Sequence, residues 1–434
     1  MRILCIIPPY LPSYFNAGHH LPVFQVGAFL RKHLPQAEIT CLDCAALNIT
    51  WKEVCDILTK GFDVIAVLND FDAIDTFSRF QYYQRLLAPS AKTITFGRLS
   101  KQIPRFFFQF HFNAVVASGD YEIGVLNYIK YLRGDITELP GVLLSKESSH
   151  LLGTYLDPEE WVLPNINDIP YMAYHYMYKN DLNKFCGIPE RMELVVPLAR
   201  GCPVNCLYCD VPPMQGKIER RLSVTRTIDY IQNSFATLPF EYVSFYAPTF
   251  TLNKPWVKEL CSKLIELPKR YFWKCVTVLK TLDEEIISLM SESHCVRISL
   301  GIESFTNAAA IGLPNVKQNT LDTFKTMARL CQKYNIELNC FIMLGMPGDT
   351  PQDAQHTIDV CLEYGARVRP AIYTPYQNMR ENMLPEEISY YNRQLFPPNF
   401  LPADIAAQYY DIFYNNRKDK KTTIMEKIIP AAAC

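Results

Sequence analysis

Two series of alternating apolar runs and helical stretches constrain the fold of this 434-residue chain most strongly. The first series places strand-like runs at residues 2–7, 38–41, 64–68, 93–96 and 114–117. The second places them at residues 194–197, 242–246, 273–278, 296–302, 337–344 and 369–373. Regular alternation of this kind predicts an α/β protein with parallel sheets, whose ligands lie beyond the carboxyl ends of the strands.

The spacing of these runs predicts four regions. We expect a doubly wound, Rossmann-like domain over residues 1–135 and a partial (β/α)6 barrel over residues 191–375. Residues 136–190 are rich in Pro, Tyr and Asn and read as a bridging linker. Residues 376–434 form a C-terminal extension that we expect to cap the barrel opening.

Three cysteines follow the first strand of the second series. Cys202, Cys206 and Cys209 have the spacing C-x3-C-x2-C on a loop marked by a glycine. Three thiolates can bind three irons of a [4Fe–4S] cubane, which leaves the fourth iron open for chemistry. A structural zinc site needs four closed ligands, and no His lies between Cys209 and Cys261 to complete one.

Composition limits the kinds of binding partner and the cellular compartment that we expect for this protein. The formal net charge is −1, so no basic field attracts nucleic acid or acidic lipid, and a small molecule is the expected partner. Fifteen cysteines without an even, close spacing indicate reduced thiols. No apolar run approaches the roughly 20 residues of a membrane span, and the run at residues 3–7 is too short for a signal peptide. We therefore expect a cytoplasmic protein.

With Tyr208 directly before its last cysteine, the loop resembles the signature of the radical S-adenosylmethionine (radical SAM) superfamily. The resemblance implies that SAM chelates the open iron and is cleaved to a 5′-deoxyadenosyl radical, which abstracts hydrogen from a substrate. It also implies an electron donor such as flavodoxin or ferredoxin. Tyr208 is equally consistent with a core aromatic on a strand-to-helix turn.

Other stretches resemble radical SAM enzymes that carry an N-terminal cobalamin-binding-type domain. They are Pro8-Pro9-Tyr10, Ser118-Gly119-Asp120-Tyr121-Glu122, Leu139-Pro140-Gly141, Ser299-Leu300-Gly301-Ile302-Glu303-Ser304 and Met343-Leu344-Gly345-Met346-Pro347-Gly348-Asp349-Thr350. In that family the segment matched by Ser299 and Glu303 binds the ribose hydroxyls of SAM, and the turn at Gly345 brings backbone close to the ligand. An ion-paired glutamate and a plain turn are the alternative interpretations.

The chain departs from the family at one edge of the barrel. Family members often carry a polar pair after the second strand, near the SAM amino group, whereas this chain reads Tyr246-Ala247-Pro248-Thr249-Phe250-Thr251. Lys280 follows the third strand and either meets the SAM carboxylate or is solvated.

The sequence of the first domain does not decide whether the protein binds cobalamin. No histidine here has the Asp-x-His-x-x-Gly context of a cobalt ligand, and His19 and His20 read as surface or capping residues. The turn that would face the corrin, Thr95-Phe96-Gly97-Arg98, has a single glycine. Some methyltransferases of the family nevertheless bind cobalamin without a histidine ligand.

A narrower resemblance links Phe15-Asn16-Ala17-Gly18-His19 and Leu68-Asn69-Asp70-Phe71-Asp72 to radical SAM diol dehydratases of aminoglycoside deoxygenation. It favours radical dehydration of a small polar metabolite, such as a sugar or aminoglycoside, in natural-product biosynthesis, completed by a separate reductase. Cobalamin-dependent methyl transfer is the alternative function. A third hypothesis is a non-catalytic metal-binding scaffold. Residues 373–378 at the sixth strand end are a candidate substrate segment or a simple loop.

Overall fold

The computed structural model describes the chain except for residues 12–18, 150, 179–186, 189, 307–312 and 418–434. The chain forms two compact units, each built from more than one segment. The first contains residues 1–177, 210–216 and 376–392, and the second contains residues 178–209, 217–375 and 393–434. The domain boundaries expected at residues 135, 190 and 375 remain predictions, because compactness does not measure independent folding.

The first unit is built on a six-stranded sheet. Its strands are β1 (Arg2–Ile7), β2 (Glu38–Asp43), β3 (Val64–Asn69), β4 (Lys92–Gly97), β5 (Ala114–Val116) and β6 (Val142–Leu143). They are ordered β2-β1-β3-β4-β5-β6, and β1 to β5 are parallel while β6 pairs antiparallel with β5. The order reverses between β1 and β3, as in a doubly wound fold, so ligands are expected at the carboxyl ends of these strands.

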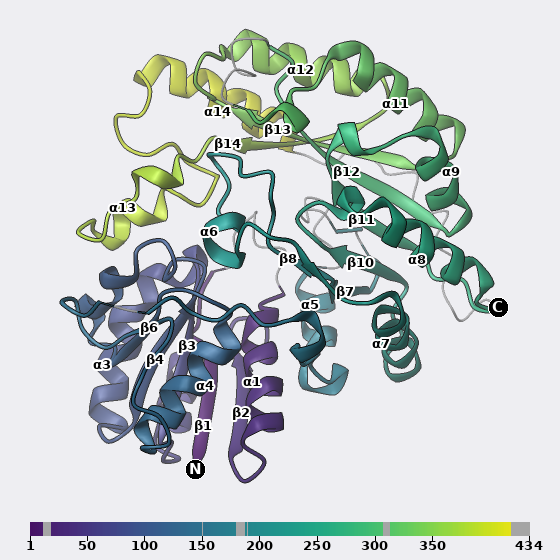
Figure 1. Cartoon of the computed structure of the whole chain (residues 1–434). Coiled ribbons are helices and arrows are strands. Elements are labelled where there is room, and N and C mark those ends of the chain that lie inside the picture. The colour runs from purple at the N-terminus through teal and green to yellow at the C-terminus, as the bar shows by residue number, and fades with distance from the viewer. Residues whose placement is uncertain (12–18, 150, 179–186, 189, 307–312, 418–434) are drawn as a thin grey trace. The chain divides into compact units, whose positions relative to one another are not determined.

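Helices cover both faces of this sheet, as right-handed crossovers require (Figure 1). They are α1 (Leu21–His33), α2 (Trp51–Leu58), α3 (Phe77–Leu87) and α4 (Tyr121–Leu132). α1 packs against α4, and α2 packs against α3. Strands β1 and β3 are almost wholly buried, which explains their continuous Ile, Val and Leu runs.

The second unit contains a parallel sheet in the order β14-β13-β12-β11-β10-β7. The strands are β7 (Glu193–Pro197), β10 (Tyr242–Tyr246), β11 (Trp273–Thr277), β12 (Cys295–Glu303), β13 (Glu337–Leu344) and β14 (Arg367–Ile372). Each strand pairs in parallel with its neighbour, as the six βα repeats predict. This arrangement is the open barrel expected from the sequence.

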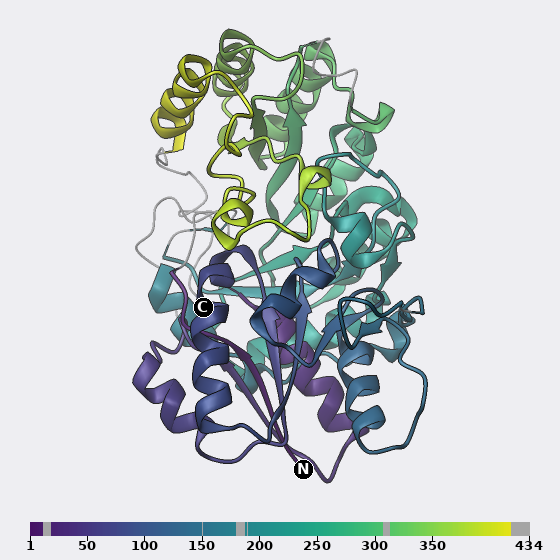
Figure 2. The same cartoon turned by 90° about the vertical axis from the view of Figure 1, so that its left-hand side faces the viewer.

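Helices follow these strands along one side of the sheet (Figure 1). They are α7 (Val224–Thr237), α8 (Lys254–Glu266), α9 (Glu284–Glu292), α11 (Leu321–Lys333) and α12 (Pro351–Glu363). The C-terminal helix α14 (Ala403–Arg417), yellow in Figure 2, packs on β14 and α12. A two-stranded hairpin of β8 (Ala199–Arg200) and β9 (Arg220–Arg221) brackets the cysteine loop.

Three short helices complete the architecture. α5 (Tyr171–Tyr178) lies within the stretch predicted as a linker, most of which belongs to the first unit. α6 (Val211–Gln215) begins two residues after Cys209, and α13 (Pro385–Ser389) packs on the 3-10 helix η1 (Phe71–Thr76). Both α6 and α13 belong to the first unit.

Candidate functional site

The three cysteines of the loop lie beyond the carboxyl end of β7. Cys202 and Cys206 are each 8% exposed, Cys209 is half-buried, and all three are free thiols. The loop is tightly turned, because Cys209 N donates to Cys206 O at 3.0 Å and Asn205 has a left-handed φ of 56°. The turned backbone therefore keeps the three cysteines on one short loop.

An apolar cluster surrounds this loop. It consists of Cys206, Tyr208, Leu313, Met343, Met346 and Tyr373, with Val204, Cys209 and Phe400 packed against it. Burial in this cluster raises the pKa of the Cys206 thiol. Such surroundings exclude water from a bound metal group and strengthen nearby electrostatic interactions.

Within the described residues, no three His, Cys, Asp or Glu side chains converge on the position of a single metal ion. A cubane does not require such convergence, because each thiolate binds a different iron. The donor set of three thiols in apolar surroundings fits a [4Fe–4S] cluster, and Cys202, Cys206 and Cys209 would hold it.

Glu303 is the polar centre of the site and ends strand β12. It is 4% exposed and has a left-handed φ of 64°, beside an irregularity in the pairing of β12 with β13. Its Oε1 accepts hydrogen bonds from Tyr208 Oη at 2.9 Å and Lys317 Nζ at 2.8 Å. Tyr208 thus bonds the glutamate predicted to bind SAM, in addition to packing in the apolar cluster.

Lys317 was not singled out by any sequence motif. It lies at the end of the 3-10 helix η7 (Asn315–Lys317), and its side chain is 13% exposed. Burial alone would lower the pKa of Lys317, but Glu303 and the thiols of Cys206 and Cys209 raise it above its usual value. The ammonium therefore stays charged.

The other predicted SAM contacts have partners within the protein. Ser299 is buried in β12 and accepts a hydrogen bond from Asn339 Nδ2 at 3.2 Å. A Cβ on Gly345, whose φ is 78°, would lie 2.6 Å from the Phe396 ring, so packing alone requires glycine there. Lys280 is exposed and donates to Asn315 O at 2.6 Å. The roles of Ser299 and Gly345 toward SAM remain predictions.

The carboxyl edge of the first sheet contains a buried polar cluster. Tyr10 Oη and Asp43 Oδ2 lie 2.8 and 2.9 Å from His20 Nδ1, and Tyr174 Oη donates to the same Asp43 oxygen at 2.7 Å. His20 is 3% exposed, so the expectation of a surface histidine was wrong, although the residue does occupy the N-cap position of α1. Burial opposes the charged form, but Asp43 raises the pKa of His20.

Arg98 occupies the ends of β3 and β4 in the same unit. Its guanidinium forms an ion pair with Asp210, donates to Tyr376 Oη at 3.1 Å and lies over the Phe71 ring at 5.2 Å. The single glycine of this turn, Gly97, is required by the chain itself, because a Cβ there would collide with the backbone of Asn69. Arg98 therefore bonds both Asp210 and Tyr376 at the strand ends where a doubly wound fold binds its ligands.

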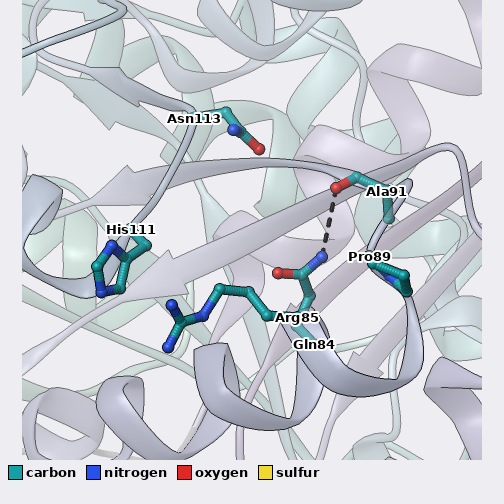
Figure 3. Close-up of a pocket in the computed structure, with 6 residues that line it drawn as sticks. All are labelled: Gln84, Arg85, Pro89, Ala91, His111 and Asn113. Carbon is teal, nitrogen blue, oxygen red and sulfur yellow. Dashed lines mark hydrogen bonds between the residues drawn. The ribbon is translucent and has the colours of Figure 1, made fainter.

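Figure 3 shows a pocket of the first unit at the opposite, amino-terminal edge of the sheet. Gln84, Arg85, Pro89, Ala91, His111 and Asn113 line it. Gln84 Nε2 donates to Ala91 O at 3.3 Å across it. Its position away from the strand carboxyl ends separates it from the expected ligand edge.

Comparison with known proteins identifies the second unit. Residues 196–361, from β7 into α12, match the family model described as the radical SAM superfamily. This match covers 166 of the 434 residues, so the chain is similar to the radical SAM superfamily over this segment. Members of this family use a [4Fe–4S] cluster and SAM, which agrees with the donor set found here. None of the described helices combines the length and the apolar character that a membrane crossing needs.

An uncharacterised methyltransferase of Pyrococcus horikoshii is 27% identical over 231 residues, which are 52% of this chain and 48% of the relative. The match thus spans about half the length of that protein. TsrM of Kitasatospora setae, a radical SAM methyltransferase solved with cobalamin and a [4Fe–4S] cluster, has a similar fold. The TM-score is 0.68 at 16% identity, over 87% of this chain and 75% of TsrM.

The cobalamin-dependent radical SAM enzyme OxsB has a TM-score of 0.66 at 15% identity, over 83% of this chain and 51% of OxsB. Both likenesses extend over the first unit, so the two-part fold predicted from the sequence is confirmed. At these identities they show the fold alone.

Proposed function

We propose that the protein is a radical SAM enzyme that starts the methylation of a small polar substrate by abstracting a hydrogen atom. The observation that carries the radical step is the three-cysteine loop beside the Tyr208–Glu303–Lys317 contacts. Methyl transfer replaces dehydration as the preferred outcome, because the curated relative and TsrM are both named methyltransferases.

When bound, the reduced cluster supplies the electron that cleaves SAM to methionine and a 5′-deoxyadenosyl radical. The protein's own part is to bind, orient and exclude water. Cys202, Cys206 and Cys209 would hold the [4Fe–4S] cluster, and Tyr208 and Met343 pack with Cys206 in the apolar surroundings.

We propose that Glu303 orients SAM through its ribose hydroxyls. Tyr208 and Lys317 both donate to Oε1, and within the part of the chain that the structure describes no side chain donates to Oε2. A carboxylate oxygen with two lone pairs can accept from both hydroxyls of a ribose. We propose that Oε2 has this role, with Ser299 and the turn at Gly345 as further contacts.

The partners follow from this chemistry. An electron donor such as flavodoxin or ferredoxin must deliver one electron for each SAM that is cleaved. A separate reductase is needed only if the outcome is dehydration.

Product analysis tests the proposal. The protein is reconstituted anaerobically with iron and sulfide, then incubated with SAM, dithionite and a panel of small polar sugars, with and without hydroxocobalamin. We expect 5′-deoxyadenosine together with S-adenosylhomocysteine when hydroxocobalamin is present. 5′-Deoxyadenosine without S-adenosylhomocysteine would exclude methyl transfer on these substrates and favour dehydration.

A further inference from the structure

A buried lysine lies between a carboxylate and the cysteine loop. Lys317 Nζ is 2.8 Å from Glu303 Oε1, and its side chain is 13% exposed. A lysine this buried is costly unless it is paired. Glu303 offsets one positive charge, and Tyr208 donates to the same oxygen without adding charge.

Strand β12 leaves space for the Lys317 ammonium at Gly301, which has no side chain. A Cβ on Gly301 would collide with Lys317 Nζ and lie 2.6 Å from Glu303 Oε1. Next to the lysine, Gln318 Nε2 donates to Leu313 O at 2.9 Å, which anchors its segment to the apolar cluster. The position of Lys317 is thus fixed by Gly301 on strand β12 and by Gln318, the residue that follows it.

The ammonium is also linked to the cysteine loop, because Tyr208, which lies between Cys206 and Cys209, donates to the same Glu303 oxygen as Lys317. The thiols of Cys206 and Cys209 interact electrostatically with Lys317, and both belong to or pack on the apolar cluster. Because that cluster excludes water, a unit charge there is poorly screened.

We propose that Lys317 is a positioning residue that raises the reduction potential of the bound [4Fe–4S] cluster and fixes Glu303. Reduction adds one electron to the cluster from the electron donor, so the reduced form carries one more negative charge. A fixed cation nearby stabilises that form. No bond forms or breaks at Lys317. The inference rests on the proposed function, because it requires the cluster to bind at this loop.

The test is the midpoint potential of the reconstituted protein, followed by electron paramagnetic resonance in a redox titration. Lys317→Met removes the charge with a side chain of similar length, and Lys317→Gln removes it while keeping a donor to Glu303. We expect about a tenfold less favourable reduction in both, a potential about 59 mV more negative for one electron. Lys317→Arg, which keeps the charge, should stay close to the wild type.

Lys333→Met is the matched control, because Lys333 is an exposed lysine that pairs with Glu284 at 2.6 Å. Its potential should equal that of the wild type. Equal potentials in the wild type, Lys317→Met and Lys317→Gln would overturn the inference. If Lys317→Met fails to fold, Lys317→Gln alone decides. A wild-type protein that binds no cluster would instead refute the proposed function.

Discussion

At the scale of single residues, Glu303 carries the most chemistry in the described site. Its left-handed backbone at the end of β12 turns the carboxylate toward Tyr208 and Lys317. Strained backbone of this kind persists only where surrounding contacts over-determine it. The contact of Tyr208 with Glu303 links the cysteine loop to the strand predicted to bind ribose.

Asp349 provides a pH-dependent test at the same scale. Burial raises the pKa of this carboxyl to about 6, although Thr306 and Ser304 donate hydrogen bonds to it. The folded state therefore binds this proton more tightly than the unfolded state. The stability that it contributes is complete below the unfolded pKa of 3.8 and is lost as the pH rises through about 6.

Above about pH 6 the folded protein must bury an ionised carboxylate at Asp349, which costs stability. We expect Asp349→Asn to remove this cost. Its melting temperature relative to that of the wild type should be higher at pH 7.5 than at pH 4.5, as measured by thermal denaturation at both values. Asp359→Asn, a change on the exposed part of α12, is the control and should show no such pH dependence. A difference for Asp349→Asn that does not vary with pH would argue against a buried, perturbed carboxyl.

At the scale of elements, the carboxyl ends of the first sheet are occupied by the chain's own side chains. Arg98 after β4 pairs with Asp210 before α6, and Phe71 after β3 stacks on Tyr376 with ring centroids 5.9 Å apart. The residue that follows Cys209 in sequence is therefore anchored to the first unit. That sheet edge is where a doubly wound fold binds its ligands.

We expect these contacts to oppose cobalamin. The double variant Arg98→Ala with Asp210→Asn removes both charges, so that no buried carboxylate is left unpaired. The double variant should bind hydroxocobalamin about tenfold more tightly than the wild type. The reason is that the ligand no longer has to break the Arg98–Asp210 ion pair at the sheet edge. Equilibrium dialysis measures both affinities.

Arg105→Ala is the control for this comparison. Arg105 is a half-buried arginine of the same unit, 3.6 Å from Glu381, and its loss should leave the affinity unchanged. Equal affinity in the wild type and the double variant would show that Arg98 does not obstruct the site.

Sequence patterns predicted the elements better than the contacts between them. The six strands of the parallel sheet in the second unit were expected because buried parallel strands are continuous apolar runs. The antiparallel strand β6 was missed, since two residues give no readable period. Lys317 was missed because its pairing joins residues 14 positions apart in the chain, which no local motif records.

The same reasoning explains the error at His20. A histidine at a helix start is usually exposed, but Asp43 and Tyr174 lie 23 and 154 residues away from His20 in sequence. Only the fold brings these partners to one sheet edge. The cysteine loop, by contrast, could be recognised, because all its ligand positions lie within eight residues.

At the scale of the whole molecule, the chain joins a radical SAM domain to a unit with the fold of cobalamin-binding relatives. The central claim is that the second unit cleaves SAM at a cluster held by the three cysteines. That claim can be tested without knowing the substrate, because reductive cleavage releases 5′-deoxyadenosine even in its absence.

The most direct measurement is therefore 5′-deoxyadenosine formed from SAM and dithionite by the reconstituted protein, with iron content determined on the same sample. We expect product from the wild type and none from Cys206→Ala, which should also lose cluster absorbance while remaining folded. A wild-type protein that holds a full cluster yet releases no 5′-deoxyadenosine, or a Cys206→Ala variant with unchanged iron content and activity, would contradict the account.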